Sequence, residues 1–173
     1  DLLNQIGVTP HRIASPDIDE TPRKGELARV YALRMAVEKA HAVNRASREI
    51  IIAGDTTVAV GRRILPQAAD ADMQRGFLKL LSGRRHHVLS AVCVIGADGS
   101  ARSRLSDSIV RFKRLSDAEM DAYIDTKEGL GKAGGYAIQG RAEALIDWMA
   151  GSHSGVIGLP LYETRALLRS AGY

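Results

Sequence analysis

Two strand-forming segments, 87–95 and 101–112, follow one another across a short polar turn. The first contains Val88–Ile95, a run in which Ser90 is the only polar residue. The turn, Ala97–Ser100, reads Ala-Asp-Gly-Ser, and a glycine-containing turn between two such segments is typical of a β-hairpin. The sequence therefore predicts a long hairpin and, with it, a β-sheet.

Segments with helical periodicity alternate with further strand-like segments along the rest of the chain. We expect helices over 1–6, 25–46, 70–81, 116–126 and 161–171. We expect further strands over 8–15, 49–54, 57–60, 64–65 and 143–149. Because helices and strands alternate while hairpins intervene, the predicted fold is an α/β domain on a mixed sheet that combines parallel and antiparallel pairs.

The composition limits the class of protein. The 173 residues suit one domain, and 45% hydrophobic with 25% charged residues is the profile of a soluble globule. The net charge of +4 is not gathered into a basic run, which argues against a nucleic-acid-binding surface. Cys93, the only cysteine, can form no internal disulfide, and its apolar neighbours predict a buried thiol. No apolar run approaches the roughly 20 residues that span a bilayer, so we expect a cytoplasmic protein.

The segment Gly131–Gly140, Gly-Lys-Ala-Gly-Gly-Tyr-Ala-Ile-Gln-Gly, combines backbone freedom with polar groups. Glycines let the main chain approach a bound group closely, and free backbone N–H groups beside Lys132 suit an anion such as phosphate. Gln139 adds a donor and an acceptor that match a nucleobase edge. The segment therefore predicts a nucleotide site.

Carboxylates occur at two places where they could carry chemistry. Asp55 follows the strand expected over 49–54, and sheet enzymes place ligands at the carboxyl ends of strands. It is either a catalytic acid or base, or a turn aspartate that caps backbone N–H groups. Asp17, Asp19 and Glu20 lie within four residues and either face water or share a hard divalent cation. Glu20 is the first candidate for such a cation, and Asp19 is the second.

Lys39 and Lys132 stand out because arginines outnumber lysines in this chain. Lys39 lies beside the packed face of the helix expected over 25–46. One apolar stripe predicted for that helix consists of Val30, Leu33, Val37 and Ala40, and a second apolar line consists of Ala28, Ala32 and Met35 and ends at Lys39. A lysine in this place either pairs with a buried carboxylate or a phosphate, or extends to water. Gln67 lies just before a helix start, and His153, in a glycine- and serine-rich loop, is a second-rank candidate for a general base.

The sequence contains no nucleophile elbow, Walker A loop or Rossmann fingerprint, which argues against acyl hydrolases, kinases and dehydrogenases. The order of its motifs instead resembles that of the Maf family of nucleoside-triphosphate pyrophosphatases, across residues 1–173. The matching motifs are Asp19-Glu20, Glu38-Lys39-Ala40, Ala53-Gly54-Asp55-Thr56, Leu81-Ser82-Gly83, Lys132-Ala133-Gly134, Ile138-Gln139-Gly140, Gly151-Ser152 and Gly158-Leu159-Pro160-Leu161. Each motif alone is weak evidence, whereas the ordered set is specific.

The resemblance implies one domain over residues 1–173, with a twisted mixed sheet, flanking helices and two lobes around a central cleft. It implies a homodimer that hydrolyses the α–β phosphoanhydride of a nucleoside triphosphate, giving the monophosphate and pyrophosphate. It also implies a divalent metal cofactor, Mg²⁺ or Mn²⁺. Neither a nucleic acid nor a membrane is an expected partner.

The resemblance also implies roles for four charged residues. Asp55 would be the general base, or would hold the attacking water near the metal. Glu20 would help Asp55 to bind that metal. Lys39, the third member of the catalytic set, and Lys132, a substrate-binding residue, would meet phosphate or hold the carboxylates in place.

Thr56, Gln67 and Gln139 are further substrate-binding residues by this resemblance. Thr56 and the Ile-Gln-Gly triplet that contains Gln139 resemble the branch that prefers dTTP and UTP, rather than the branch that prefers 7-methyl-GTP. Gln67 stands where the family commonly has a lysine, and the family's Ser-x-Ser-Pro-Arg-Arg loop would precede Asp1–Leu3. These departures keep open a second hypothesis, a non-catalytic nucleotide-binding regulator of cell division or septum formation. A third, a nucleic-acid-binding domain, has only the basic charge in its favour.

Overall fold

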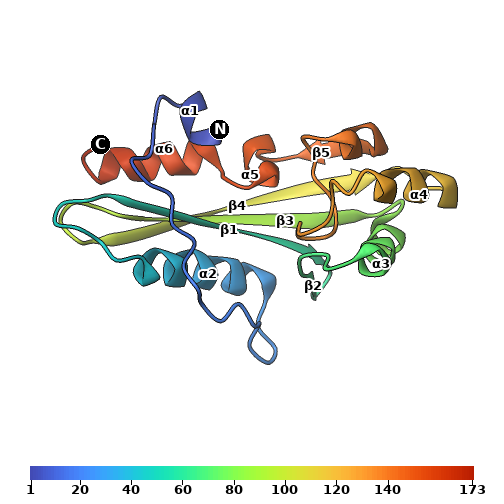
Figure 1. Cartoon of the computed structure of the whole chain (residues 1–173), viewed down its shortest axis with the longest axis horizontal. Helices are drawn as coiled ribbons and strands as arrows, with labels where there is room; N and C mark the ends of the chain where they lie inside the picture. Colours follow the sequence, from blue (N-terminus) through green and yellow to red (C-terminus); the bar gives the residue numbers. More distant parts are fainter.

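A five-stranded sheet forms the middle layer of the computed structural model, which describes residues 1–173 (Figure 1). The elements in chain order are α1 (Leu2–Gln5), α2 (Ala28–Ala42), β1 (Ile51–Val60), β2 (Arg63–Leu65), α3 (Ala71–Leu81), β3 (Arg85–Ile95), β4 (Ala101–Phe112), α4 (Asp117–Asp125), a 3₁₀ helix η1 (Arg141–Leu145), β5 (Ile146–Ala150), α5 (His153–Ile157) and α6 (Leu161–Ser170). The predicted long hairpin is confirmed as β3–β4, in which Ile95 pairs with Ala101 and Arg85 with Arg111.

The strands lie in the order β2-β1-β3-β4-β5, and every neighbouring pair is antiparallel. The α/β class is confirmed, but the parallel pairs expected of a mixed sheet do not occur between these strands. The helical connection through α3 does join two strands of the same direction, β2 and β3. They form no parallel ladder because β1 lies between them and runs the opposite way.

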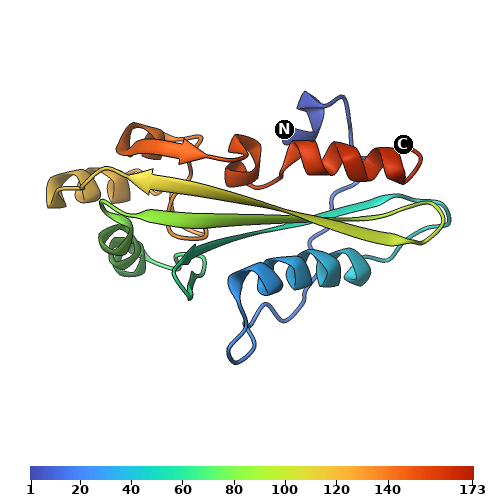
Figure 2. The ribbon, with the colours of Figure 1, turned by 180° about the vertical axis from the view of Figure 1, so that it is seen from behind.

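Helices cover both faces of the sheet (Figures 1 and 2). α2 lies across β1 and β3 on one face, and α6 lies across β3 and β4 on the other. The buried residues between α2 and the sheet include Ala32, Ala36, Ala40, Ala91 and Cys93. Because these side chains are short, the helix backbone lies close to the strands. None of the helices combines the length and the hydropathy that crossing a bilayer requires.

α2 is shorter than the predicted helix over 25–46, and its buried side includes Ala32 and Met35 of the second predicted apolar line as well as Ala40 of the first stripe. Val30, expected in the core, is exposed, and the side chains that are fully buried include Ala32 and Met35. Lys39 lies at the edge of this packed face, as predicted, with its side chain 20% exposed.

The second lobe is built around α3 and α4, at the end of the sheet where β3 begins and β4 ends (Figure 1). Its buried core includes Phe77, Leu78, Leu81, Phe112 and Met120. Both helices begin as predicted. Asp70 accepts a hydrogen bond from Met73 N at 2.8 Å, and Ser116 and Glu119 form a capping box.

Two predicted strands take other forms. Residues 8–15 contain no strand: Val8 packs in the core beneath α6, and the chain beyond it is exposed. Pro10 and Pro16 lack the N–H group that a strand ladder needs, which weakens pairing here. The strand expected over 143–149 begins later, because η1 occupies Arg141–Leu145 and β5 starts at Ile146.

β1 is one continuous strand through residues that were expected to divide it. Asp55 therefore lies in mid-strand, not at a strand end as predicted. On one side β1 pairs with β3 from Ile51 to Ala59, but on the other side β2 pairs only with Val58–Val60. The edge of β1 before Val58 is free of strand partners, and Asp55 lies on this stretch of β1 with its side chain almost fully buried.

Candidate functional site

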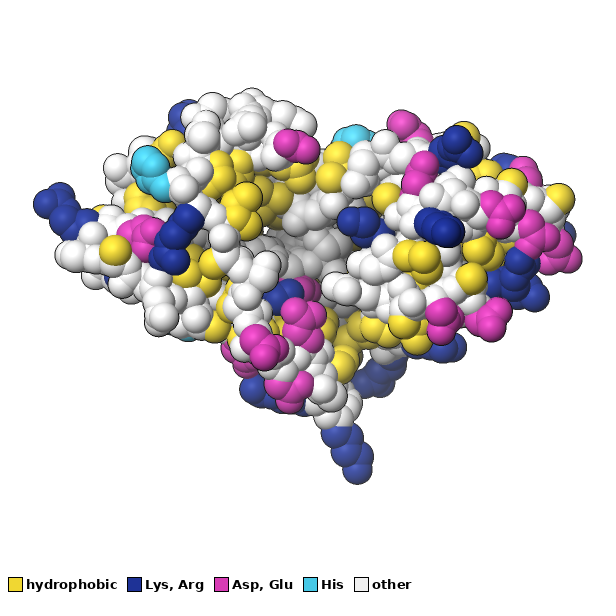
Figure 3. Space-filling model, viewed as in Figure 1, with side chains coloured by type: hydrophobic (Ala, Val, Ile, Leu, Met, Phe, Trp, Pro, Cys, Tyr) yellow, Lys and Arg dark blue, Asp and Glu magenta, His cyan; other side chains and the backbone are white.

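A cleft of about 230 Å³ lies at the free edge of β1, and the space-filling view shows a hollow between two lobes (Figure 3). β1 contributes Gly54, Asp55 and Thr56 to the cleft, and α2 contributes Lys39. The other walls come from Gln67 after β2, from the glycine-rich segment, and from α5 with the residue that follows it. The predicted cleft between lobes is thus present, and distant parts of the chain meet in it.

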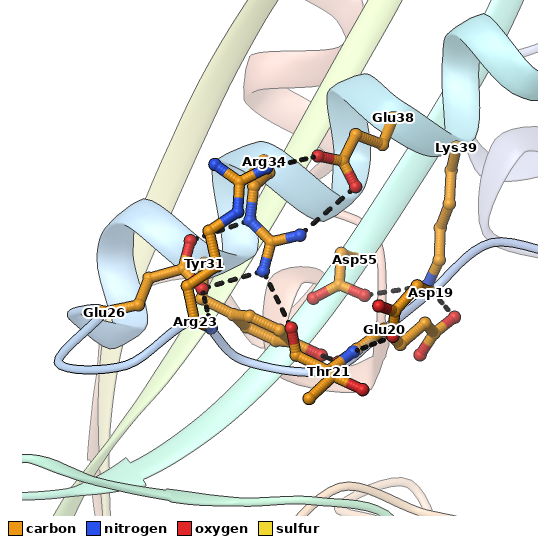
Figure 4. A network of polar contacts seen from close by, with 10 residues as sticks. All are labelled: Asp19, Glu20, Thr21, Arg23, Glu26, Tyr31, Arg34, Glu38, Lys39 and Asp55. Atoms are coloured by element: carbon orange, nitrogen blue, oxygen red, sulfur yellow. Dashed lines mark hydrogen bonds and ion pairs between the residues drawn. The ribbon is translucent and has the colours of Figure 1, made fainter.

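Lys39 links two carboxylates at the wall of this cleft (Figure 4). Its Nζ donates to Asp55 Oδ1 at 2.8 Å and lies 2.9 Å from Glu20 Oε1. The Asp55 side chain is 8% exposed and that of Glu20 is 45% exposed, so the link to Asp55 is the better buried of the two. Burial alone would lower the pKa of Lys39, but the hydrogen bonds to Asp55 and Glu20 raise it above its ordinary value. The three predicted catalytic residues therefore lie together, with Lys39 charged.

The second oxygen of the Asp55 carboxylate is held by a residue that the sequence analysis did not single out. Thr57 Oγ1 donates to Asp55 Oδ2 at 2.9 Å, and Thr57 is buried. The two-residue repeat of a strand puts Asp55 and Thr57 on one face of β1, and this spacing is the signal that would have found it. With one bond to each oxygen, the carboxylate is fixed in orientation.

The glycine-rich segment forms a second wall, tied to the chain after β2 by main-chain hydrogen bonds. Gly131 N donates to Ala68 O at 2.9 Å, and Ala68 N donates to Lys132 O at 3.1 Å. These bonds place Lys132 and Gln67 in the same wall of the cleft. At Gly134 the backbone has φ +68°, and a Cβ there would lie 2.8 Å from Val58 Cγ1. Only glycine fits this close approach to β1.

The segment around α5 forms the third wall, and Thr56 is tied to it. Thr56 Oγ1 donates to Gly158 O at 3.3 Å. Ser90, on the neighbouring strand β3, donates from Oγ to Gly155 O, so the segment is anchored twice to the sheet. The predicted substrate-binding Thr56 thus lies in the cleft.

The floor of the cleft is apolar and rests on a buried aromatic cluster. Val58, Val88 and Tyr136 line it. The Tyr136 hydroxyl lies 2.7 Å from His86 Nε2, and the His86 ring stacks on Phe112. Burial lowers the pKa of His86 to about 4, so this histidine is neutral and packs as part of the aromatic cluster. An apolar floor beside a charged wall suits a ligand with a flat ring at one end and phosphates at the other.

Several predicted candidates lie away from the cleft. Gln139 is exposed and is not among the residues that line it. His153 lies in the first turn of α5, is also exposed, and does not line the cleft. Asp19 is engaged locally, because its Oδ1 accepts from Thr21 N at 2.9 Å. Hydrogen bonding to Thr21 lowers the pKa of Asp19, which keeps it ionised.

Glu20 and Asp55 are the residues that could hold a divalent cation. Their carboxylate oxygens are the hard donors that Mg²⁺ and Mn²⁺ prefer. No group of three or more His, Cys, Asp or Glu side chains is gathered closely enough to form a complete protein-only site. Mg²⁺ is commonly bound by one or two carboxylates, with water and substrate phosphates completing its shell. The pair therefore fits a cation that binds together with a phosphorylated substrate.

Comparison with known proteins identifies the relatives of this chain. The family model described as "Maf-like protein" matches residues 1–171. A dTTP/UTP pyrophosphatase from Sphingopyxis alaskensis is 64% identical over 172 residues, which cover 99% of this chain and 90% of the relative. A protein of the same name from Novosphingobium aromaticivorans is 57% identical over 173 residues, covering 99% of this chain and 86% of the relative. Another, from Caulobacter vibrioides, is 54% identical over 175 residues, covering 100% of this chain and 90% of the relative. The resemblance that the ordered motifs indicated is thereby confirmed, and this chain belongs to the family of Maf-like proteins.

Proposed function

We propose that this protein is a nucleoside triphosphate pyrophosphatase, which hydrolyses dTTP and UTP to the monophosphate and pyrophosphate. The observation that carries the proposal is that Asp55 and Lys39 line one wall of the cleft and Lys132 lines another. Glu20 is not itself a lining residue, but its carboxylate pairs with Lys39 beside Asp55. The choice of substrates is supported by the names of the relatives, which share 50% to 64% of their aligned residues with this chain.

The charges of the site match the needs of phosphoanhydride hydrolysis. Asp55 would orient the attacking water and accept its proton, because its carboxylate is held rigidly at the cleft. Lys39 keeps both carboxylates in place and offsets part of their charge. Lys132 takes part in none of the protein's ion pairs, so its ammonium is available for substrate phosphates.

The same charges explain why we propose a divalent metal cofactor, Mg²⁺ or Mn²⁺. Two carboxylates beside one ammonium leave the wall around Lys39 with a net negative charge, which repels a bare polyphosphate. Glu20 and Asp55 would hold the cation. When bound, such a cation neutralises phosphate oxygens and polarises the phosphorus centre.

The remaining predicted residues have narrower roles in this proposal. Thr56 and Gln67 line the cleft and would contact the nucleotide there, whereas Gln139 would need the substrate to extend beyond the cleft. The homodimer that the family resemblance implies, and the cytoplasmic location expected from the lack of a long apolar run, also belong to the proposal. A non-catalytic regulator of cell division is not favoured, because the relatives carry the name of an enzyme.

Turnover and its dependence on Asp55 test this function directly. The full-length protein should release pyrophosphate from dTTP and UTP with Mg²⁺, and more slowly from dCTP and dATP. Asp55→Asn should lower kcat by about 100-fold or more, since a lost general base costs about 10²–10⁴ in rate. Asp147→Asn, at an exposed aspartate of β5, is the matched control and should keep wild-type turnover. Release of no pyrophosphate by the wild type, with nucleotide binding retained, would instead support the regulator.

A further inference from the structure

Residues 19–26, which we term the strap, run beside α2 without regular secondary structure and carry Glu20 (Figure 4). The Glu20 side chain is 45% exposed, and its carboxylate has a single charged partner, Lys39. A glutamate on an irregular segment has many accessible positions, because both its backbone and its side chain are free to rotate. Something other than the Glu20 side chain must therefore hold the carboxylate near Asp55.

Two side chains of α2 donate hydrogen bonds to consecutive main-chain carbonyls of the strap. The Tyr31 hydroxyl donates to Glu20 O at 2.8 Å, and Arg34 Nη2 donates to Thr21 O at 3.1 Å. Together the two bonds fix the two peptide units that follow the Glu20 side chain. Lys39, which pairs with the Glu20 carboxylate, lies on the same helix two turns after Tyr31. One rigid element thus positions both the backbone and the charged end of Glu20.

Arg34 also holds the far end of the strap. Its guanidinium donates to Glu26 Oε1 at 2.8 Å and to Glu26 Oε2 at 2.7 Å, which makes a bidentate salt bridge. The Glu26 side chain is only 5% exposed. A further bond reaches Glu38 Oε2 at 3.2 Å, on the next turn of α2. Such paired bonds fix the relative orientation of both groups, which a lysine could not do. Arg34 therefore ties two points of the strap to α2.

We propose that Tyr31 and Arg34 are positioning residues, which hold the strap so that the Glu20 carboxylate meets Lys39 beside Asp55. The anchoring is a property of the fold, while its effect on turnover rests on the proposed function. The two parts are tested by separate measurements.

Tyr31→Phe is the sharpest variant, because it removes one oxygen and keeps the buried ring. It should lower kcat/KM for dTTP by about three- to tenfold, the range that the loss of one hydrogen bond produces. In a Glu20→Gln background, the same change should alter kcat/KM by less than about twofold, since Tyr31 acts through Glu20. Tyr162→Phe, at an exposed tyrosine of α6, is the matched control and should leave kcat/KM unchanged.

Limited proteolysis reports on the strap without any turnover. Trypsin can cleave after Lys24, which is exposed. Cleavage there, followed by mass spectrometry, should be about threefold or more faster in Tyr31→Phe and in Arg34→Met than in the wild type. Arg29→Met is the control on the same helix, because Arg29 pairs with Asp107 rather than with the strap, and it should leave this cleavage unchanged.

The outcomes separate the two proposals. Unchanged cleavage after Lys24 in both variants would overturn the positioning role, and so would an undiminished effect of Tyr31→Phe in the Glu20→Gln background. Faster cleavage in a protein that hydrolyses neither dTTP nor UTP would support the anchoring and overturn the proposed function alone. Circular dichroism spectra that match the wild type confirm that each variant is folded.

Discussion

Removal of the Lys39 ammonium should destabilise the folded protein by an amount that the structure allows us to estimate. In Lys39→Met, the Asp55 carboxylate loses a partner at 2.8 Å while it remains almost fully buried. Taking one partner from a buried ion pair typically costs about 3–5 kcal/mol. Because the Lys39 side chain is 20% exposed, water screens part of the interaction. We therefore expect the free energy of unfolding at pH 7 to fall by about 2–3 kcal/mol.

The contribution of Lys39 to the free energy of unfolding should depend on pH in a definite direction. The pKa of Lys39 is raised in the folded protein above its ordinary value of 10.5, so the folded state holds the proton more tightly. Its contribution is complete below pH 10.5 and is lost as the pH rises through the raised value. The difference between wild type and Lys39→Met should thus be constant near neutral pH and shrink under strongly alkaline conditions.

Urea unfolding followed by far-ultraviolet circular dichroism measures this difference. Lys79→Met is the matched control, because Lys79 is an exposed lysine of α3 without an ion-pair partner, and it should change the free energy by no more than about 0.5 kcal/mol. A loss below about 1 kcal/mol in Lys39→Met, or one equal to that of the control, would refute the argument that Lys39 compensates a buried charge.

Two further predictions concern the scaffold of the cleft. Gly134→Ala should lower the free energy of unfolding, measured by urea titration, by about 2–4 kcal/mol, because the added Cβ clashes with Val58 and φ is unfavourable for alanine. In Gly131→Ala the added Cβ meets nothing within 4 Å, so the free energy of unfolding should fall by only about 1 kcal/mol. An equal cost at both glycines would contradict the close-packing argument. His86 has its pKa lowered to about 4 from 6.5, so it takes up a proton on unfolding, and stability should fall by about 3 kcal/mol as the pH drops through this interval. In His86→Gln this pH slope should be reduced, and an unchanged slope would assign it to other groups.

Some parts of this protein are encoded within a few consecutive residues. The helix starts at Asp70 and Ser116 and the turn after Ile95 lie where the sequence predicts them, and both starts are capped. These features are stabilised by hydrogen bonds between residues that are close neighbours in the chain, so a short window contains all the information. The motif order that indicated the Maf family is equally a property of the linear sequence, and comparison confirmed it.

The arrangement of strands was less predictable, and the cleft depends on it. Nothing near Asp55 in the sequence indicates that β1 continues past it, or that β2 pairs only with Val58–Val60. Because β2 is short, most of that edge of β1 stays unpaired. Strand pairing depends on two separate segments, so the residues around Asp55 cannot reveal it. The expected strand end at Asp55 was therefore wrong, although Asp55 does line the cleft, and its catalytic role stays a prediction.

By itself, the sequence determined the starts of α3 and α4, the turn between β3 and β4, the family, and the residue types available for chemistry, including Asp55, Lys39 and Glu20. Only the tertiary structure decided that one ammonium bridges both carboxylates, that Thr57 holds the second oxygen of Asp55, and that Gln139 stands outside the cleft. The physical reason is distance along the chain. Contacts between segments that are far apart in sequence form only when the sheet and α2 pack together. A local sequence pattern does not indicate which side chains this packing places within hydrogen-bonding distance.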